Sequence, residues 1–303
     1  MQIARTVEDA KAIARAWRRA GETVGLVPTM GYLHEGHASL IERARRENDR
    51  VAVSVFLNPT QFAPNEDLAS YPRDFDRDVA LCETIGADLV FHPEPEAMYH
   101  DPHAFVSIDL LSETMDGAAR PIHFRGVCTV VSKLFNIFLP DRAYFGQKDA
   151  QQLAVLRTVF TQLDIPVRVH PVPIMRAEDG VALSSRNQYL SDEERIRARA
   201  LSRALRRGAE VAEAGAKSAQ IVAECRSVID AEGGIDLDYI ALVDAGTFEI
   251  LAGTESVPVG EGAAAPTILS DGSREGRILI AAKVGTTRLI DNMEVPLRDA
   301  SGP

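Results

Sequence analysis

Apolar runs that are typical of buried strands alternate with helix-like segments as far as residue 172. The predicted strands cover residues 23–27, 51–57, 88–91, 143–145 and 167–172. The predicted helices cover residues 10–20, 38–44, 75–85, 127–138 and 149–163. Parallel strands are buried on both faces, and they are joined by crossover helices in βαβ units. The alternation therefore predicts an α/β fold built on a doubly wound, mostly parallel, Rossmann-like sheet.

The composition changes after residue 186, where a capping-box pattern begins a new Ala/Arg-rich helix. The predicted elements beyond this point are helices over residues 195–214 and 218–231 and strands over residues 238–243 and 277–284. We therefore expect two domains, residues 1–187 and a smaller C-terminal α+β lid domain over residues 188–303. Residues 253–276 are rich in Gly, Ala, Pro and Ser, which predicts a flexible insertion between strands.

Composition and charge exclude several classes of protein. With 46% hydrophobic and 25% charged residues, the chain has the composition of a soluble globular protein. Its formal charge of -11 disfavours a general nucleic-acid surface. No apolar stretch approaches the ~20 residues that cross a bilayer, and the N-terminus lacks a signal pattern. The three cysteines follow no disulfide or metal pattern, so we expect buried thiols in a cytoplasmic protein.

Two histidines, His34 and His37, lie where the predicted strand 23–27 leads into the predicted helix 38–44. Unpaired N–H groups and the helix dipole at such a junction favour an anion, and side chains three residues apart share one face of the first turn. Both imidazoles can therefore donate to one polyphosphate. Zinc ligands or a satisfied surface pair remain alternatives. Zinc is the weaker one, because the cysteines are widely separated and no second compact His/Cys cluster is evident.

Two further segments offer donors to an anion. Residues 146–149 follow the predicted strand 143–145, and there Lys148 can pair with phosphate oxygens while Asp149 can accept from a ribose. Residues 184–186 combine two hydroxyls with a guanidinium. Alone, the first is more simply a surface ion pair and the second a polar loop. Together with the histidines, they favour one extended anion. The chain has neither a G-x-G-x-x-G pattern nor a P-loop, so a nicotinamide or Walker-type site is not supported.

A series of motifs in order resembles the pantothenate synthetase family, the pantoate:β-alanine ligases among the cytidylyltransferase-like class I nucleotidyl transferases. The resemblance covers nearly the whole chain. The matching residues are Pro28-Thr29-Met30-Gly31, Leu33-His34-Glu35-Gly36-His37, Asn58-Pro59 with Gln61-Phe62, Tyr71-Pro72-Arg73, His123-Phe124-Arg125-Gly126-Val127, Phe145-Gly146 with Lys148-Asp149 and Gln151-Gln152, Ser184-Ser185-Arg186-Asn187, and Gly285-Thr286-Thr287-Arg288-Leu289-Ile290-Asp291-Asn292.

The resemblance implies ATP-dependent condensation of (R)-pantoate with β-alanine. The products would be pantothenate, AMP and pyrophosphate, formed through a bound pantoyl adenylate with no covalent enzyme intermediate. Mg²⁺ would accompany ATP, and no protein ligand of the metal is assigned. The family also implies a homodimer that meets through its N-terminal domains, with small molecules as the other partners.

Carried over by position, the catalytic residues are His37, His34 and Lys148, with His37 as the donor when charge develops. The implied ATP-binding residues are Met30, Gly31, His34, Gly36, His37, Gly146, Gln147, Lys148, Asp149, Met175, Leu183, Ser184, Ser185 and Arg186. The implied substrate-binding residues are Gln61, Gln152, Met30 and Arg120. Gln147 stands where many relatives have Glu, and Leu183 where some have Met. Arg120 either approaches the β-alanine carboxylate or forms a surface ion pair.

Some carboxylates have a simpler interpretation than catalysis or metal binding. Asp74, Asp76 and Asp78 at the start of the predicted helix 75–85 are expected to complement the helix dipole and face water.

Two other functions share the histidine site. A nucleotidyltransferase that stops after AMP transfer would need a basic pocket for a phosphate-bearing acceptor, whereas Gln61 and Gln152 suggest an uncharged pocket. A nucleotide-sensing module would need no acceptor pocket.

Overall fold

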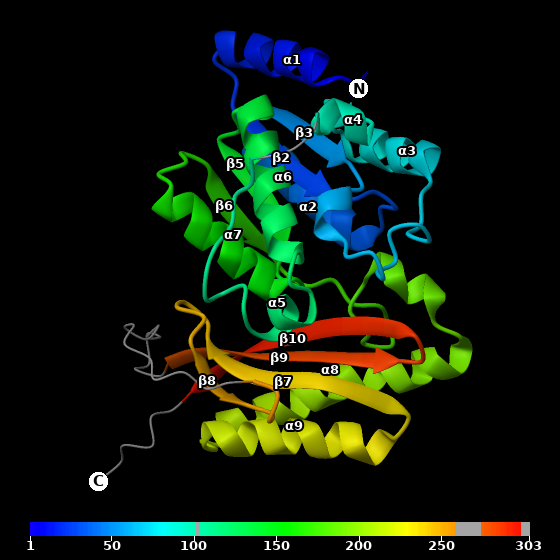
Figure 1. Ribbon diagram of the computed structural model, residues 1–303, viewed down its shortest axis with the longest axis vertical. Helices are drawn as coiled ribbons and strands as arrows, with labels where there is room; N and C mark the ends of the chain where they lie inside the picture. The colour runs from blue at the N-terminus through cyan, green and yellow to red at the C-terminus, as the bar shows by residue number, and fades with distance from the viewer. Residues whose placement is uncertain (101–103, 258–273, 298–303) are drawn as a thin grey trace.

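The computed structural model describes residues 1–100, 104–257 and 274–297. Within these residues the strands form two sheets, one of six strands and one of four (Figure 1). The six-stranded sheet is parallel and has the order β1-β4-β3-β2-β5-β6. The four-stranded sheet is antiparallel and has the order β10-β9-β7-β8. The predicted fold class is therefore confirmed.

The parallel sheet contains every strand predicted as far as residue 172. Its strands are β1 (Gln2–Ala4), β2 (Val24–Thr29), β3 (Arg50–Val55), β4 (Leu89–Phe91), β5 (Arg142–Gly146) and β6 (Arg168–Val172). The longer helices around it are α1 (Val7–Arg19), α2 (Glu35–Glu47), α3 (Phe75–Ile85), α6 (His123–Phe138) and α7 (Ala150–Gln162). Short helical segments are η1 (Pro59–Gln61), α4 (Pro95–Met98), α5 (Met115–Ala119) and η2 (Ser185–Tyr189). The prediction missed β1, which is only three residues long.

Successive residues of the central strands face opposite sides of the parallel sheet, and each side carries its own apolar core. Leu26 packs with residues of α1, α6 and α7, whereas the next residue, Val27, packs with residues of α2 and α3. In β3, Ala52 belongs to the same core as Leu26, and Val53 belongs to the same core as Val27. Burial on both faces explains why these strands are nearly continuous apolar runs. The rigid sheet fixes where the loops at its carboxyl ends begin.

The strand order places a topological switch beside β2. From β2 the chain adds β3 and then β4 on one side, and it later adds β5 and β6 on the other side. Loops leave the carboxyl ends of β2 and β5 in different directions, and a crevice forms between them. His34 follows β2 and Lys148 follows β5. The topology therefore brings the two predicted anion-binding segments to one edge of the sheet.

The C-terminal sheet is covered by helices on one face and by the parallel-sheet part of the molecule on the other. Its elements are α8 (Asp192–Glu213), α9 (Ser218–Glu232), β7 (Ile235–Asp244), β8 (Ile250–Gly253), β9 (Arg274–Val284) and β10 (Thr287–Leu297). Ile240 and Ile280 pack with α8 and α9, whereas Tyr239 and Leu279 pack with Met115 of α5 and Ala150 of α7. Figure 1 shows α5 between the two sheets.

The C-terminal part begins with the predicted capping box. The capping box is present, because the Ser191 side chain accepts from the Glu194 amide and the Glu194 carboxylate accepts from the Ser191 amide. Strands β8 and β10 were not predicted. Of the predicted insertion, Gly253 ends β8 and Arg274 begins β9, and residues 258–273 lie outside the described residues.

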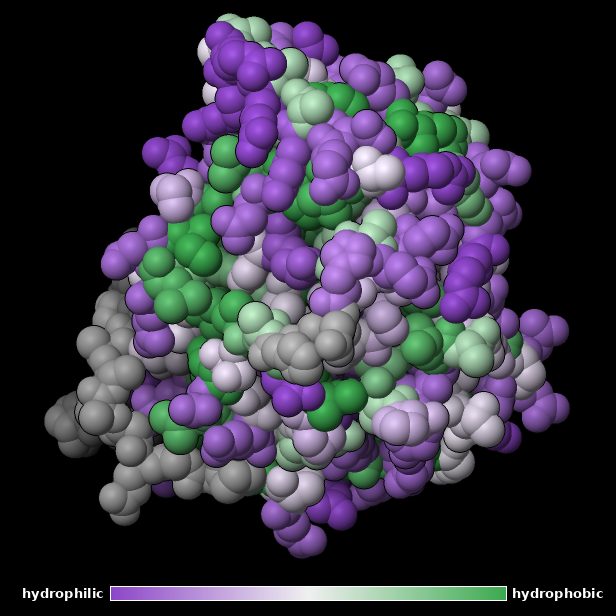
Figure 2. Space-filling model, turned by 45° about the horizontal axis from the view of Figure 1, so that its top comes forward, coloured by the Kyte–Doolittle hydropathy of each residue, from purple (hydrophilic) through white to green (hydrophobic). Residues whose placement is uncertain are grey.

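The surface mixes polar and apolar side chains. Figure 2 shows hydrophilic residues interspersed with smaller hydrophobic areas over one face. The three cysteines, Cys82, Cys128 and Cys225, are buried and unpaired as expected, and burial raises the pKa of each thiol to about 12. In the described parts of the chain, no helix has the length and apolar character needed to cross a membrane.

Candidate active site

A cavity of about 210 Å³ opens where four parallel strands end. Its lining includes the loops after β2, β3, β5 and β6, represented by His34, Gln61, Lys148 and Met175, together with residues of α6. A second cavity, of about 870 Å³, shares part of this lining and extends to Arg288 of β10. The residues that line both are Arg120, His123, Lys148, Asp149, Gln152, Ser184 and Arg186.

Most of the predicted site residues line the smaller cavity, although they come from distant parts of the sequence. They are Met30, His34, Gly36, His37, Gln61, Arg120, Gly146, Lys148, Asp149, Gln152, Met175, Leu183, Ser184, Ser185 and Arg186. Gly31 and Gln147, which are both described, line neither cavity. The Gly31 amide instead donates to Thr29 Oγ1 (3.2 Å), and the Gln147 side chain turns away to donate to Glu294 (3.2 Å).

The two histidines cap their own helix. His34 is the N-cap of α2, and its Nδ1 accepts from the Gly36 amide (3.1 Å), while His37 Nδ1 accepts from the His34 amide (3.3 Å). An imidazole nitrogen that accepts from N–H carries no proton, so each neutral ring keeps its proton on Nε2. The amides expected to bind an anion are thus partly used. The two Nε2–H groups are not used in these bonds and can donate to a ligand.

The spacing of the two histidines depends on Gly36 between them. A Cβ at Gly36 would lie only 2.9 Å from Cε1 and 3.0 Å from Nδ1 of His34. The glycine therefore lets the imidazole of His34 lie against the backbone of the first turn. The two rings end 4.1 Å apart between centroids. This explains in physical terms why the H-x-G-H pattern needs its glycine.

Both imidazoles are neutral at pH 7. Burial, helped by the nearby Lys148 ammonium, lowers the pKa of His34 to about 4. Burial and the neighbouring His34 lower the pKa of His37 well below its ordinary value. Each ring can therefore donate a hydrogen bond through Nε2–H without carrying a formal charge.

Lys148 provides the positive charge beside these donors. It follows β5 in the loop before α7, and its side chain is 19% exposed. Its Nζ lies 3.8 Å from Asp149 Oδ1, which is a loose ion pair. An ammonium with so little compensation can accept a further anionic partner. The surface-pair interpretation of Lys148 is therefore incomplete, because the same side chain also lines the cavity.

Two arginines of the site are already paired with carboxylates from one loop. Arg186 donates to Asp67 through Nε (2.8 Å) and Nη2 (2.9 Å). Arg120 donates to Glu66, with a shortest distance of 2.6 Å, and to His123 Nε2 (3.2 Å). The Arg120 side chain is only 16% exposed, so its ion pair lies inside the cavity wall instead of on the surface. Both guanidinium groups are thus bound by carboxylates of the protein itself.

Asp78 corrects one prediction. It was expected to face water, but it is 1% exposed and accepts from the amides of Tyr32 (2.8 Å) and Leu33 (2.6 Å). These bonds hold the turn that leads to His34, in which Tyr32 has a φ of 51°. Left-handed backbone is uncommon for a bulky residue and needs support from its surroundings. The carboxylate of Asp78 thus positions the histidine loop, a role that its place in the first turn of α3 concealed.

The uncharged side of the cavity is built on η1. The Gln61 amide donates to Met30 Sδ (3.1 Å) and accepts from Asn58 (3.0 Å). Asn58 also donates to the Gly126 carbonyl (3.1 Å). A Cβ at Gly126 would lie 2.5 Å from the Thr60 carbonyl oxygen, so only glycine allows α6 to approach η1 this closely. These contacts hold the Gln61 amide at the cavity.

Together, the fold and the site define a class of α/β enzymes that bind an anionic substrate at the switch point of a parallel sheet. The family model described as pantoate-beta-alanine ligase matches residues 2–294. A pantothenate synthetase from Clostridium botulinum is 44% identical over 299 residues, which cover 98% of this chain and 100% of the relative. The chain belongs to the pantoate–β-alanine ligase family.

Solved structures agree with this assignment. The pantothenate synthetase of Thermus thermophilus has a TM-score of 0.85 and 44% identity, covering 97% of this chain and 99% of the other. The pantoate-beta-alanine ligase of Francisella tularensis, described as complexed with beta-gamma ATP and beta-alanine, has a TM-score of 0.75 and 30% identity, covering 97% of each chain. The protein is therefore a ligase of the family that joins pantoate to β-alanine.

Proposed function

We propose that the ligation takes place in the 210 Å³ cavity through a pantoyl adenylate. In the first step, a pantoate carboxylate oxygen attacks the α-phosphorus of ATP, and the bond to the bridging oxygen breaks so that pyrophosphate leaves. In the second, the β-alanine amine attacks the acyl carbon and loses a proton, and AMP leaves with the electrons of the C–O bond. The observation that carries this proposal is that two imidazole Nε2–H donors and the Lys148 ammonium line one cavity.

Such a displacement needs positioned donors and no enzyme nucleophile. In this proposal His34 and His37 donate to the triphosphate, and His37 stabilises charge as it develops. Lys148 bridges α and γ oxygens. Because both rings are neutral, their donors do not repel the Lys148 ammonium.

The remaining ATP contacts are assigned by location. Gly146 and Asp149 would hold the ribose. Met175, whose carbonyl accepts from the Leu183 amide (2.9 Å), would present its backbone to adenine. Ser184 to Arg186 would bind the departing pyrophosphate. For Arg186 to do so, a phosphate must replace Asp67 as its partner, which exchanges one charge-assisted pair for another.

The acceptor side is assigned in the same way. Gln61 and Gln152 would bind pantoate through their amides, which can meet both hydroxyl and carboxylate oxygens without repulsive charge. The thioether of Met30 would pack against the gem-dimethyl group. Arg120 would approach the β-alanine carboxylate, which then takes the place of Glu66.

Magnesium is part of this proposal as a companion of ATP. In residues 1–100, 104–257 and 274–297, no group of three or more His, Cys, Asp and Glu side chains could hold a metal ion. Mg²⁺ is commonly held by substrate phosphates with few protein ligands. We therefore propose that phosphate oxygens supply most of its coordination and that it neutralises their charge.

The larger organisation also remains a proposal. We propose that residues 1–187 and 188–303 act as two domains, with the second as a lid, because separate helices cover the second sheet. We further propose a homodimer that meets through the N-terminal domains, as the family resemblance implies. The unpaired thiols are consistent with work in the cytoplasm.

The test is ATP–pyrophosphate exchange with and without pantoate, followed by AMP release on addition of β-alanine. The adenylate mechanism predicts exchange that requires pantoate, and AMP only after β-alanine is added. A nucleotidyltransferase with a phosphorylated acceptor would not respond to pantoate, and a nucleotide sensor would show no exchange at all. Either result would refute the proposal.

A further inference from the structure

Strand β10 of the C-terminal sheet holds the loop that carries Lys148. The Asn292 side chain donates through Nδ2 to the carbonyls of Gln147 and Lys148, both at 2.9 Å. Asn292 is 1% exposed. Both hydrogens of one buried amide are therefore used on two successive carbonyls, at the point where the chain passes from β5 to α7.

A contact to the oxygen of the Asn292 amide fixes its orientation. Arg277 of β9 donates through Nη1 to Asn292 Oδ1 (2.5 Å). A guanidinium only donates and a carbonyl only accepts, so the reversed amide would place like groups against each other on both sides. The side chain is thus locked with its two donors toward the Lys148 loop.

The neighbouring residue makes a parallel connection to the next loop. Arg176, which follows β6, donates to both carboxylate oxygens of Asp291 (2.5 and 2.9 Å) and to the Asn292 carbonyl (3.2 Å). Two adjacent residues of β10 therefore hold the segments that leave β5 and β6. Both segments line the cavity, through Lys148 and Met175.

We propose that Asn292 is a positioning residue for the ligase reaction. It fixes the backbone of Gln147 and Lys148, and through it the direction in which the Lys148 ammonium enters the cavity. The proposal rests on the role proposed above for Lys148. It also gives a function to the C-terminal motif that ends in Asp291-Asn292, because a contact in this motif is then needed for the first chemical step.

The test compares Asn292→Ala and Asn292→Asp with a matched control. Asn292→Asp keeps the volume of the side chain but turns an oxygen toward two carbonyl oxygens. Asn48→Asp makes the same change at another buried amide, whose Nδ2 donates to the Ala44 carbonyl (2.8 Å) and to Tyr144 (2.8 Å) at the opposite end of the sheet. Each variant is assayed for pantoate-dependent ATP–pyrophosphate exchange and for thermal stability.

We expect both Asn292 variants to lose about tenfold to a hundredfold in the kcat of exchange, since small misplacements of catalytic groups have effects of this size. The KM for pantoate should change much less, and hydrogen exchange should rise in the Gln147–Lys148 loop. Asn48→Asp should lower stability without this kcat effect. Asn292→Ala should add little to a Lys148→Ala variant, because residues that act as a unit are not additive.

Three results would overturn the inference. The first is a normal rate of ATP–pyrophosphate exchange in the Asn292 variants, while the same rate is lowered in Lys148→Ala. This result would leave the proposed function intact. The second is a loss of activity that follows lowered thermal stability, as a purely structural residue would give. The third is a normal rate of ATP–pyrophosphate exchange in Lys148→Ala itself. This result would refute the proposed role of Lys148 and, with it, the positioning role of Asn292.

Discussion

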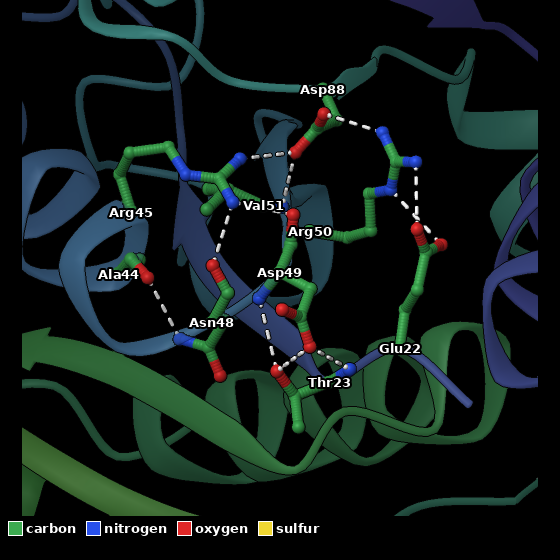
Figure 3. A network of polar contacts seen from close by, with 9 residues as sticks. All are labelled: Glu22, Thr23, Ala44, Arg45, Asn48, Asp49, Arg50, Val51 and Asp88. Carbon is green, nitrogen blue, oxygen red and sulfur yellow. Dashed lines mark hydrogen bonds and ion pairs between the residues drawn. The ribbon is translucent and has the colours of Figure 1, made fainter. Parts of the chain in front are cut away.

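The two ends of the parallel sheet use similar polar residues in opposite ways. At the amino ends, the charged side chains of Glu22, Arg45, Asp49, Arg50 and Asp88 are each bound by another residue of the protein (Figure 3). Arg50 donates to Glu22 (2.8 and 3.0 Å) and to Asp88 (3.1 Å), and Asp88 also accepts from Arg45 (2.7 Å). At the carboxyl ends, the donors face a cavity. The difference separates charges that stabilise strand starts from donors that are available to a ligand.

The amino-end network follows a simple rule of position. Asp49, Asp88 and Asp141 each lie one residue before a strand, and they accept from the amides of Thr23, Val51 and Val24, respectively. Amides at or next to the starts of neighbouring strands are thus satisfied by these carboxylates. At the other end, the Nδ1 atoms of His34 and His37 satisfy amides while their Nε2–H groups remain for a ligand. Only the second arrangement leaves donors for chemistry.

Removing a cavity donor should have the largest effect on activity. Lys148→Ala or His37→Ala should lower turnover by at least about a hundredfold, because the proposed mechanism uses each side chain as a preorganised donor to the reacting phosphates. Steady-state rates at saturating ATP, pantoate and β-alanine measure this. Thermal stability should change little in Lys148→Ala, since the pair with Asp149 is loose.

The matched change at the amino ends is Arg50→Ala. It should lower the free energy of unfolding by about 1 kcal/mol or less, because the side chain is 37% exposed, and leave turnover near the wild-type value. A large loss of activity in Arg50→Ala, or normal turnover in both cavity variants, would break the division between the two ends.

Asp78→Asn should have an intermediate effect on both properties. The asparagine can accept only through its one oxygen, so one of the amides of Tyr32 and Leu33 would face an NH₂ group. An unsatisfied buried group costs about 1–3 kcal/mol, and displacement of the histidine loop should lower turnover about tenfold. Urea unfolding and exchange assays on the same preparation measure the two effects. Unchanged turnover at reduced stability would show that Asp78 does not position His34.

The last expected effect is a difference in acid sensitivity. The pKa of His34 is about 4 in the folded protein and 6.5 in the unfolded chain. Its neutral form therefore stabilises the fold above pH 6.5, and this stability is lost as the pH falls toward 4. Hydrogen bonds from Thr23 lower the pKa of Asp49, whose contribution is lost only below pH 3.8. Of these two groups, His34 should therefore lose its stabilising contribution first as the pH falls.

Urea midpoints at pH 7 and pH 5 test this order. Wild-type protein should lose about 1–2 kcal/mol of stability over this interval, and a His34→Gln/His37→Gln variant should lose less. An equal loss in both proteins would assign the acid sensitivity to other groups.

The fold was predictable because its signals are local. Apolar runs marked the parallel strands, and the capping pattern at Ser191 marked the start of α8. The clustering of His34, Lys148 and Arg186 could also be predicted, because each segment follows the end of a strand or its adjoining loop. The carboxyl ends of parallel strands lie at one edge of a sheet.

The missed features depend on contacts between distant residues. Asp78 has the sequence context of a dipole-compensating acid, and only its bonds to Tyr32 and Leu33, 46 and 45 residues away, reveal its burial. Asn292 contacts a loop 144 residues earlier. Strand β10 was missed because Asp291 and Asn292 are adjacent, polar and both buried, which breaks the alternation expected of a half-exposed strand.

The burial of all three cysteines has a practical consequence. Thiolates are the form that reacts with maleimides, and thiols with a pKa of about 12 form almost none at neutral pH. A single cysteine introduced at an exposed position could therefore carry a fluorescent dye selectively in the otherwise natural chain. A pair of such dyes, one beside each sheet, would report the distance between the two halves of the enzyme during turnover.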